Sequence, residues 1–119
     1  MTDRVVLVVD DDDLVRKVVR AVLEADDYEV LEAPNGQVAL EMIVERKPKL
    51  VILDVMMPGI DGVDVLKRMS HDDARVLMLT ARDDLETEDA SMAAGADDFL
   101  GKPFSSLELL DHVKKLVET

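Results

Sequence analysis

Residues 50–62 read LVILDVMMPGIDG, and this stretch decides the fold. Its first part, Leu50 to Leu53, is continuously apolar, whereas a half-exposed strand would alternate apolar and polar residues. Two further runs of the same kind are Val5 to Val9 and Val76 to Leu79. Strands that are apolar on both faces are typical of parallel sheets covered by helices on both sides. We therefore expect a sheet of this kind.

Stretches with helical periodicity separate the apolar runs. Between Leu14 and Ala25, apolar residues recur every three to four positions, which predicts a surface helix packed on the sheet. The sheet-facing set is Leu14, Val15, Val18, Val19, Val22 and Leu23, and the set opposite is Arg16, Lys17, Arg20 and Glu24. Further helices are expected near residues 37–46, 63–69 and 85–94, and after Ser105, which forms a capping box with Glu108.

Two weaker strands complete the alternation. Residues 28–33 mix apolar and acidic side chains, as a short edge strand does, and residues 99–100 suggest a final strand. The order is then five strand–helix repeats with short connections. This order predicts an α/β fold, a doubly wound (βα)5 arrangement with a parallel five-stranded sheet and helices on both faces. We expect one domain over residues 1–119.

Composition and charge limit the possible functions. The 119 residues include 27 acidic and 14 basic ones, giving a net charge of −13, which repels phosphate backbones, so direct nucleic-acid binding is not expected. There is no cysteine, so a metal would need oxygen or histidine ligands, and a hard cation is favoured. No apolar run approaches the ~20 residues that span a bilayer, and residues 1–3 do not begin a signal peptide. A cytoplasmic protein without membrane association is expected.

Candidate functional residues follow four of the five expected strands. They are Asp10 and Asp11 after the first strand, Asp54 after the third, Thr80 and Ala81 after the fourth, and Lys102 after the fifth. In sheets of this type the ligand crevice lies beyond the carboxyl ends of the strands. Carboxylates that meet there repel one another, and Mg²⁺ relieves this repulsion while retaining sites for phosphate oxygens. The strand ends therefore predict a cation site suited to phosphoryl transfer.

The aspartates at and after the strand ends also have a purely structural interpretation. Asp12 and Asp13 are most simply the N-cap and a first-turn acid of the following helix. A lone aspartate after a strand, such as Asp54, is more often a turn former than a nucleophile. These structural interpretations weaken together, because all the polar groups fall at one edge of one sheet.

Four motifs, in order, resemble those of response-regulator receiver domains. They are Val8-Val9-Asp10-Asp11, Ile52-Leu53-Asp54-Val55-Met56-Met57-Pro58, Leu79-Thr80-Ala81 and Lys102-Pro103-Phe104. The resemblance covers essentially the whole chain. Its most specific parts are the block from Asp54 through Asp61-Gly62 and the Lys-Pro-Phe motif. It implies a flavodoxin-like strand order of 2-1-3-4-5.

The resemblance also implies a chemistry. Asp54 would accept a phosphoryl group from a phosphohistidine of a sensor histidine kinase or a phosphotransfer protein. Asp10, Asp11, Asp54 and the backbone carbonyl of Met56 would bind Mg²⁺, for which Mn²⁺ is a possible substitute. Lys102, with a cis peptide bond to Pro103, would offset charge on the phosphoryl oxygens. Such a domain signals, and catalyses only its own phosphorylation and dephosphorylation.

A conformational response is implied as well. The Thr80 hydroxyl and the Ala81 backbone N–H would bind the attached phosphoryl group, and Phe99 would turn inward into space that Thr80 vacates. The face formed by the fourth helix, fifth strand and fifth helix would then change. Residues 85–94 carry a thin apolar stripe, so we expect their helix to be among the less stable elements. The sequence leaves open whether the output is a separate effector protein or a fused output domain.

Two features set limits on the resemblance. Met56 and Arg82 depart from the commoner family pattern at positions that flank the route of water, which predicts an altered hydrolysis rate without giving its sign. Residues 8–12 also resemble the opening motif of haloacid-dehalogenase phosphatases, which use aspartyl-phosphate chemistry. Those enzymes need a longer fold, and they would leave Asp54 and Lys102 without a role.

Overall fold

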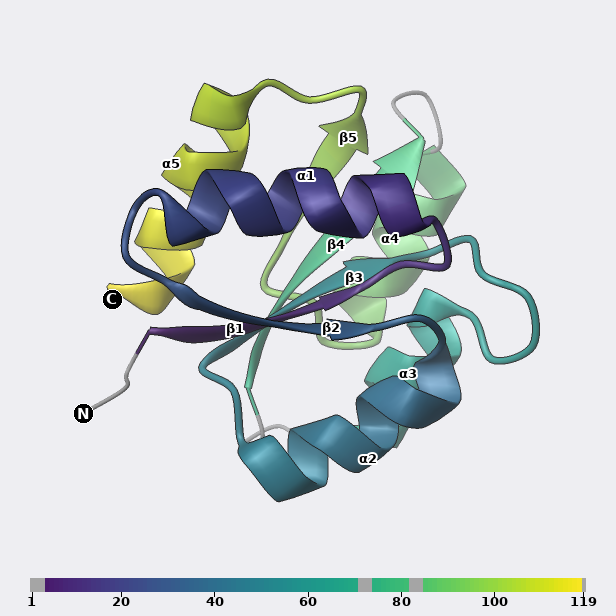
Figure 1. Cartoon of the computed structure of the whole chain (residues 1–119). Coiled ribbons are helices and arrows are strands. Elements are labelled where there is room, and N and C mark those ends of the chain that lie inside the picture. Colours follow the sequence, from purple (N-terminus) through teal and green to yellow (C-terminus); the bar gives the residue numbers. More distant parts are fainter. Residues whose placement is uncertain (1–3, 71–73, 82–84, 119) are drawn as a thin grey trace.

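The computed structural model describes residues 4–70, 74–81 and 85–118. Five parallel strands form its sheet in the order β2-β1-β3-β4-β5 (Figure 1). The strands are β1 Val5–Val9, β2 Glu29–Ala33, β3 Leu50–Asp54, β4 Arg75–Ala81 and β5 Asp98–Lys102. The helices are α1 Asp13–Glu24, α2 Gly36–Arg46, α3 Gly62–Arg68, α4 Leu85–Ala93 and α5 Ser106–Val117. The predicted doubly wound fold and its 2-1-3-4-5 order are confirmed.

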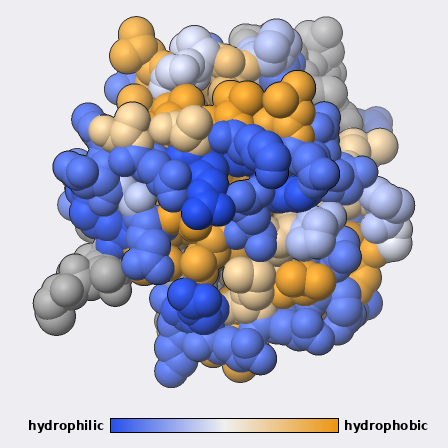
Figure 2. Space-filling model, in the orientation of Figure 1, coloured by the Kyte–Doolittle hydropathy of each residue, from blue (hydrophilic) through white to orange (hydrophobic). Residues whose placement is uncertain are grey.

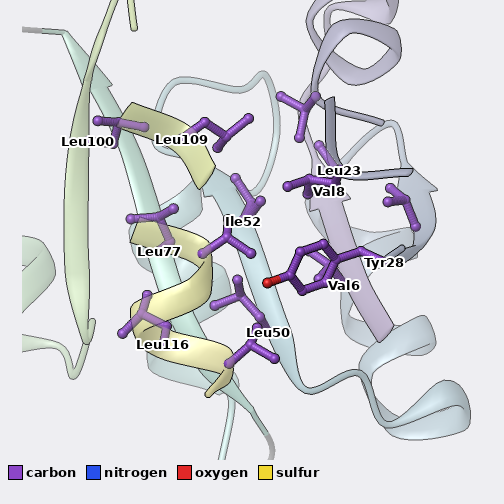
Figure 3. Packing of buried hydrophobic residues seen from close by; sticks show 14 of the residues in the cluster. Val6, Val8, Leu23, Tyr28, Leu50, Ile52, Leu77, Leu100, Leu109 and Leu116 are labelled. Atoms are coloured by element: carbon purple, nitrogen blue, oxygen red, sulfur yellow. The ribbon is translucent and has the colours of Figure 1, made fainter. Parts of the chain in front are cut away.

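Helices cover both faces of the sheet, as the continuously apolar strands require. α1 and α5 lie on one side, and α2 and α3 lie on the other (Figure 1). On the first side, the strand residues Val8 and Ile52 face Leu23 of α1 and Leu109 of α5 (Figure 3). Burying one such side chain contributes about 1.5–3 kcal/mol, so the two clusters together fix the sheet between its helices.

Helix boundaries follow the predicted capping residues. Asp12 is the N-cap of α1, where its side chain accepts a hydrogen bond from the Leu14 backbone N–H at 2.9 Å. At α5, the Ser105 and Glu108 side chains accept from each other's backbone N–H groups, so the predicted capping box is confirmed. The sequence also predicts that Asp83 or Asp84 caps α4, but both residues lie outside the part of the chain that the structure describes.

The assignment of faces on α1 is wrong at three positions. Arg16, expected on the solvent side, is only 7% exposed, whereas Leu14 and Val18, expected against the sheet, are 69% and 49% exposed. Helical periodicity assigns faces by residue polarity alone. Arg16 is buried because its long side chain reaches acceptors on three segments, which the pattern along one helix does not reveal.

α4 buries few of its residues. Ser91 is the only residue of this helix that is buried. This agrees with the thin apolar stripe in the sequence, while the low stability expected for α4 stays a prediction. Among the described residues, no helix has the length and apolar character needed to cross a bilayer.

Candidate functional site

The strand register brings the polar strand ends together. Val9 of β1 pairs with Leu53 of β3, so Asp10 and Asp54 follow neighbouring positions on adjacent strands. Across the sheet, Ala81 of β4 pairs with Lys102 of β5. In parallel strands these ends lie at one edge, the position where sheets of this kind bind ligands.

Three carboxyl groups form a cluster at this edge. Asp10, Asp11 and Asp54 each place a carboxylate oxygen within 4.8 Å of the other two. Asp10 and Asp54 are buried, with 1% and 5% of their surface exposed, and Asp11 is exposed. The Met56 backbone N–H donates to Asp54 Oδ1 at 3.3 Å, so the main chain after β3 adjoins the cluster. A donor set made only of oxygen fits a hard divalent cation such as Mg²⁺.

Lys102 lies opposite the acids. Its Nζ is 3.2 Å from Asp54 Oδ1 and 3.3 Å from Asp10 Oδ2, and its side chain is about one third exposed. One ammonium group therefore contacts both buried carboxylates. The peptide bond between Lys102 and Pro103 is cis, as predicted.

Burial and charge shift the proton affinities of this pair. Burial, reinforced by the Asp10 carboxylate, raises the pKa of Asp54 to about 6, although Lys102 and the Met56 N–H act in the opposite direction. Burial by itself would lower the pKa of Lys102, but the Asp54 and Asp10 carboxylates outweigh burial and raise it. A positive charge added near Asp54 would therefore stabilise the ionised form of its buried carboxyl group.

The remaining residues predicted for the site lie on β4 and β5. Thr80 is 2% exposed, and its Oγ1 is buried with no hydrogen-bond partner within the described part of the chain. The backbone of Ala81 ends β4 next to Lys102. Phe99 pairs with Met78 in the sheet and is half-buried against the cluster under α2 and α3. The roles of all three stay predictions.

An open groove of about 730 Å³ leads to the acids. One part of its lining is polar, with Asp10, Asp11, Asp12, Asp54 and Lys102, and the other is apolar, with Leu14, Val15, Val18, Met56, Pro103 and Phe104. Hydrophobic atoms gather along α1 above a band of hydrophilic ones (Figure 2). The groove thus joins a charged centre to an apolar wall formed by α1, by Met56 in the β3–α3 loop and by the start of the β5–α5 segment.

Sequence reasoning missed Arg16. Its Nη1 donates to the backbone carbonyl oxygen of Asp10 at 2.5 Å, so this buried base lies directly behind the acidic cluster. The available signal was its position three residues after Asp13, a spacing at which oppositely charged side chains meet on a helix.

Comparison with known proteins shows similarity to one family. Residues 6–114 match the family described as the response regulator receiver domain. The phosphate regulon transcriptional regulatory protein PhoB of Pseudomonas aeruginosa is 38% identical, over 98% of this chain and 53% of its own length. The response regulator MprA of Mycolicibacterium vanbaalenii is 45% identical, over 94% of this chain and 49% of its own. The chain thus spans about half the length of these curated relatives.

Solved structures agree with this match. The Vibrio cholerae chemotaxis protein CheY4 has a TM-score of 0.87 and 32% identity, with 94% of this chain and 97% of that one covered. The receiver domain of the Francisella response regulator 1452 has a TM-score of 0.89 and 32% identity, with 97% of each chain covered. The similarity therefore extends over nearly the full length of both solved proteins.

Proposed function

This chain belongs to the family of response regulator receiver domains of two-component systems, and we propose that Asp54 is its phosphoryl acceptor. The donor would be a phosphohistidine side chain on a sensor histidine kinase or a phosphotransfer protein. The region spanning residues 1–119 would act as one receiver domain. Its catalysis would be limited to its own phosphorylation and dephosphorylation.

One observation carries this proposal. The Asp54 carboxylate lies 3.2 Å from the Lys102 ammonium group and shares a cluster with the carboxylates of Asp10 and Asp11. A nucleophile, a fixed positive charge and a set of oxygen ligands are thus within reach of one phosphorus atom. Phosphoryl transfer depends mainly on positioning and on neutralising charge, and this arrangement supports both.

The transfer is an in-line displacement. An Asp54 oxygen forms a bond to phosphorus while the N–P bond of the phosphohistidine breaks, and its electron pair stays on the imidazole. Mg²⁺ bound by Asp10, Asp11, Asp54 and the Met56 carbonyl would supply positive charge to the phosphoryl oxygens, and Mn²⁺ could replace it. Lys102 neutralises charge on another phosphoryl oxygen. Dephosphorylation is a separate step, in which a water oxygen attacks phosphorus, the bond between phosphorus and the Asp54 oxygen breaks with its electron pair left on the carboxylate, and the proton of the water passes to solvent as inorganic phosphate leaves.

The apolar wall of the groove suits the approach of a protein donor. Leu14 and Met56 are 69% and 73% exposed beside the acids. Exposed apolar side chains next to a reactive group favour docking of a protein surface, because they can be buried only when a partner is bound. Their position supports a protein donor over a free phosphate ester.

The response to phosphorylation would begin at Thr80. Its buried hydroxyl lacks a partner in the described structure, which leaves it able to bind a phosphoryl oxygen. Together with the Ala81 N–H, it would draw the end of β4 toward the site, and Phe99 would turn inward. α4, with only Ser91 buried, is the element most easily repositioned.

The output would act through protein contacts. The named relatives are about twice as long as this chain, and one of them is described as a transcriptional regulator. With a net charge of −13, the receiver itself is not expected to bind nucleic acid. It would signal to a downstream effector protein or to a fused output domain.

The proposal is tested by incubating the protein with Mg²⁺ and a small phosphodonor such as acetyl phosphate, followed by intact mass measurement. We expect one added phosphoryl group, dependent on Mg²⁺ and absent in Asp54→Asn. Equal labelling of Asp54→Asn would overturn the assignment. The haloacid-dehalogenase alternative is not favoured, because the receiver match spans residues 6–114. Hydrolysis of a general phosphomonoester by this chain would restore it.

A further inference from the structure

Arg16 is the only buried basic residue among residues 4–70, 74–81 and 85–118, with 7% of its surface exposed. A guanidinium group is expensive to remove from water unless each of its donors is matched. Neither the proposed nucleophile nor the proposed cation ligands include it. Its burial therefore calls for a role in the structure around the acids.

The guanidinium of Arg16 joins three segments. Its Nη1 donates to the Asp10 backbone carbonyl at 2.5 Å, its Nε donates to Glu32 Oε1 at 3.1 Å, and its Nη2 contacts the Asp13 carboxylate. These partners lie at the end of β1, in β2 and at the start of α1. Helical side chains lean toward the N-terminus of their helix, and Arg16 thereby reaches back to the β1–α1 turn.

The hydrogen bond from Arg16 to the Asp10 backbone carbonyl adds to two contacts that the Asp10 carboxylate already makes. Asp10 Oδ1 accepts from the Asp12 backbone N–H at 3.0 Å, and Oδ2 lies 3.3 Å from Lys102 Nζ. With Arg16 on the carbonyl, each of the three oxygen atoms of Asp10 has a donor, two of them from the start of α1 and one from Lys102 at the end of β5. These contacts fix the direction of the Asp10 carboxylate.

Arg16 also places positive charge where acids are crowded. Four aspartates occupy positions 10–13, and Glu32 lies on the neighbouring strand. Lys102 offsets this charge from the groove side, and Arg16 offsets it from behind the turn. Repulsion among the acids would otherwise spread the turn apart when no cation is bound.

We propose that Arg16 is a positioning residue that presets the β1–α1 turn for binding a divalent cation, by holding the Asp10 carbonyl and tying it to Glu32. This inference rests on the proposed function for the identity of the cation. Groups that orient metal ligands change metal affinity by about 10- to 100-fold when they are removed. Arg16 acts on the ligand through its backbone and does not itself touch the cation.

Arg20 provides a matched control on the same helix. Its Nη1 bonds to Glu32 Oε2 at 2.9 Å, so it shares one partner with Arg16 but has no contact with Asp10 in the described structure. Arg16→Met and Arg20→Met each remove one base that contacts Glu32. Only the first removes the donor to the Asp10 carbonyl.

The test uses Mg²⁺ titration by calorimetry together with amide hydrogen exchange of the metal-free protein. For Arg16→Met we expect Mg²⁺ affinity to fall about 10- to 100-fold and the Asp12 amide, which bonds to Asp10, to lose protection. Saturating Mg²⁺ should restore most of the phosphorylation rate. Arg20→Met should retain the affinity and the Asp12 protection of the original protein.

Other outcomes overturn the inference. Equal loss of Mg²⁺ affinity in both variants would mean that Arg16 acts only through its positive charge. Unchanged affinity in both would mean that Arg16 does not position the β1–α1 turn for the cation. If Arg16→Met fails to fold, Arg16→Lys and Arg20→Lys replace the pair, because lysine keeps the charge but lacks the fork of donors. Mg²⁺-dependent labelling of Asp54 with unchanged affinity in Arg16→Met contradicts this inference alone. No labelling of the original protein contradicts the proposed function.

Discussion

The backbone of Gly62 lies against the backbone carbonyl of Asp54. A Cβ atom at position 62 would lie 2.3 Å from that oxygen and 2.9 Å from the Cα of Val55. The Gly62 N–H also donates to the Val55 carbonyl at 3.0 Å. The start of α3 is therefore packed directly on the segment that carries the proposed phosphoryl acceptor.

Gly62→Ala should displace this segment. Alanine normally favours a helix over glycine by about 1 kcal/mol, but the contact here is with backbone, which cannot move aside cheaply. Overpacking of this kind costs about 1–3 kcal/mol, so we expect lower stability together with slower labelling of Asp54. Urea denaturation and the rate of phosphorylation by a small donor measure the two effects.

Gly59→Ala is the control for this prediction. No atom of the described residues lies within 4 Å of a Cβ atom at that position, but its φ of +78° is unfavourable for alanine. It should lower stability through backbone strain while leaving the labelling rate close to that of the original protein. A Gly62→Ala variant with unaltered stability and rate would show that the close approach has no consequence.

Much of this site follows from strand ends, which sequence alone can locate. Continuous apolar runs identify β1, β3 and β4, and the residues after them meet because parallel strands end at the same edge. Asp10 and Asp54 were found in this way, whereas Lys102 follows the weaker fifth strand. Their individual roles rest on the family resemblance and remain to be tested.

Residues that act through tertiary contacts were not found. Arg16 looks like a solvent-facing helix residue, because its partner Glu32 is distant in sequence and its partner at Asp10 is a backbone atom. The close approach of Gly62 to Asp54 depends on the path of the whole β3–α3 segment. Periodicity reports the polarity of neighbouring side chains and contains no information about either contact.

Asp54→Asn should stabilise the metal-free protein at neutral pH. The pKa of Asp54 is about 6 in the folded state against an ordinary value of 3.8, so folding favours its protonated form. The folded protein binds more protons between these values, and stability falls as the pH rises through this window. Roughly two pKa units correspond to at most about 3 kcal/mol, which asparagine would recover above pH 6.

Denaturation in the presence of a chelator at pH 7.5 and near pH 4 checks this expectation. The advantage of Asp54→Asn should be present at the higher pH and small at the lower one. Mg²⁺ should then stabilise the original protein more than the variant, because a ligand stabilises the state that binds it. A metal-free Asp54→Asn variant that is less stable than the original at pH 7.5 would contradict the effect of burial on this carboxyl.

Thr80→Val separates stability from the conformational response. The Thr80 hydroxyl is buried and has no partner among the described residues, and such a group costs about 1–3 kcal/mol, so valine of similar shape should leave the unphosphorylated protein equally stable or more stable. The same change removes the proposed contact to the phosphoryl group. We expect the amide shifts of residues 85–105 on adding beryllofluoride, a phosphoryl mimic, to be much reduced.

Thr80→Ser keeps the hydroxyl and tests this interpretation. It should retain the amide response while losing about 1 kcal/mol of stability with the missing methyl group. An undiminished response in Thr80→Val would exclude the hydroxyl as the first step of the switch. An unchanged spectrum for residues 85–105 in the original protein would exclude the switch altogether.

Met56→Asn should speed the loss of the phosphoryl group. The Met56 side chain is 73% exposed and lines the groove beside Asp54, where its apolar end cannot orient a water molecule. An asparagine amide at the same place can hold the attacking water through a hydrogen bond. One such bond contributes about 0.5–1.4 kcal/mol, so hydrolysis should be about 2- to 10-fold faster.

Met56→Leu, which keeps an apolar side chain, should hydrolyse at nearly the original rate. Timing phosphate release after removal of the donor compares the three proteins, and equal rates for the asparagine and leucine variants would mean that the side chain at this position does not control the access of water.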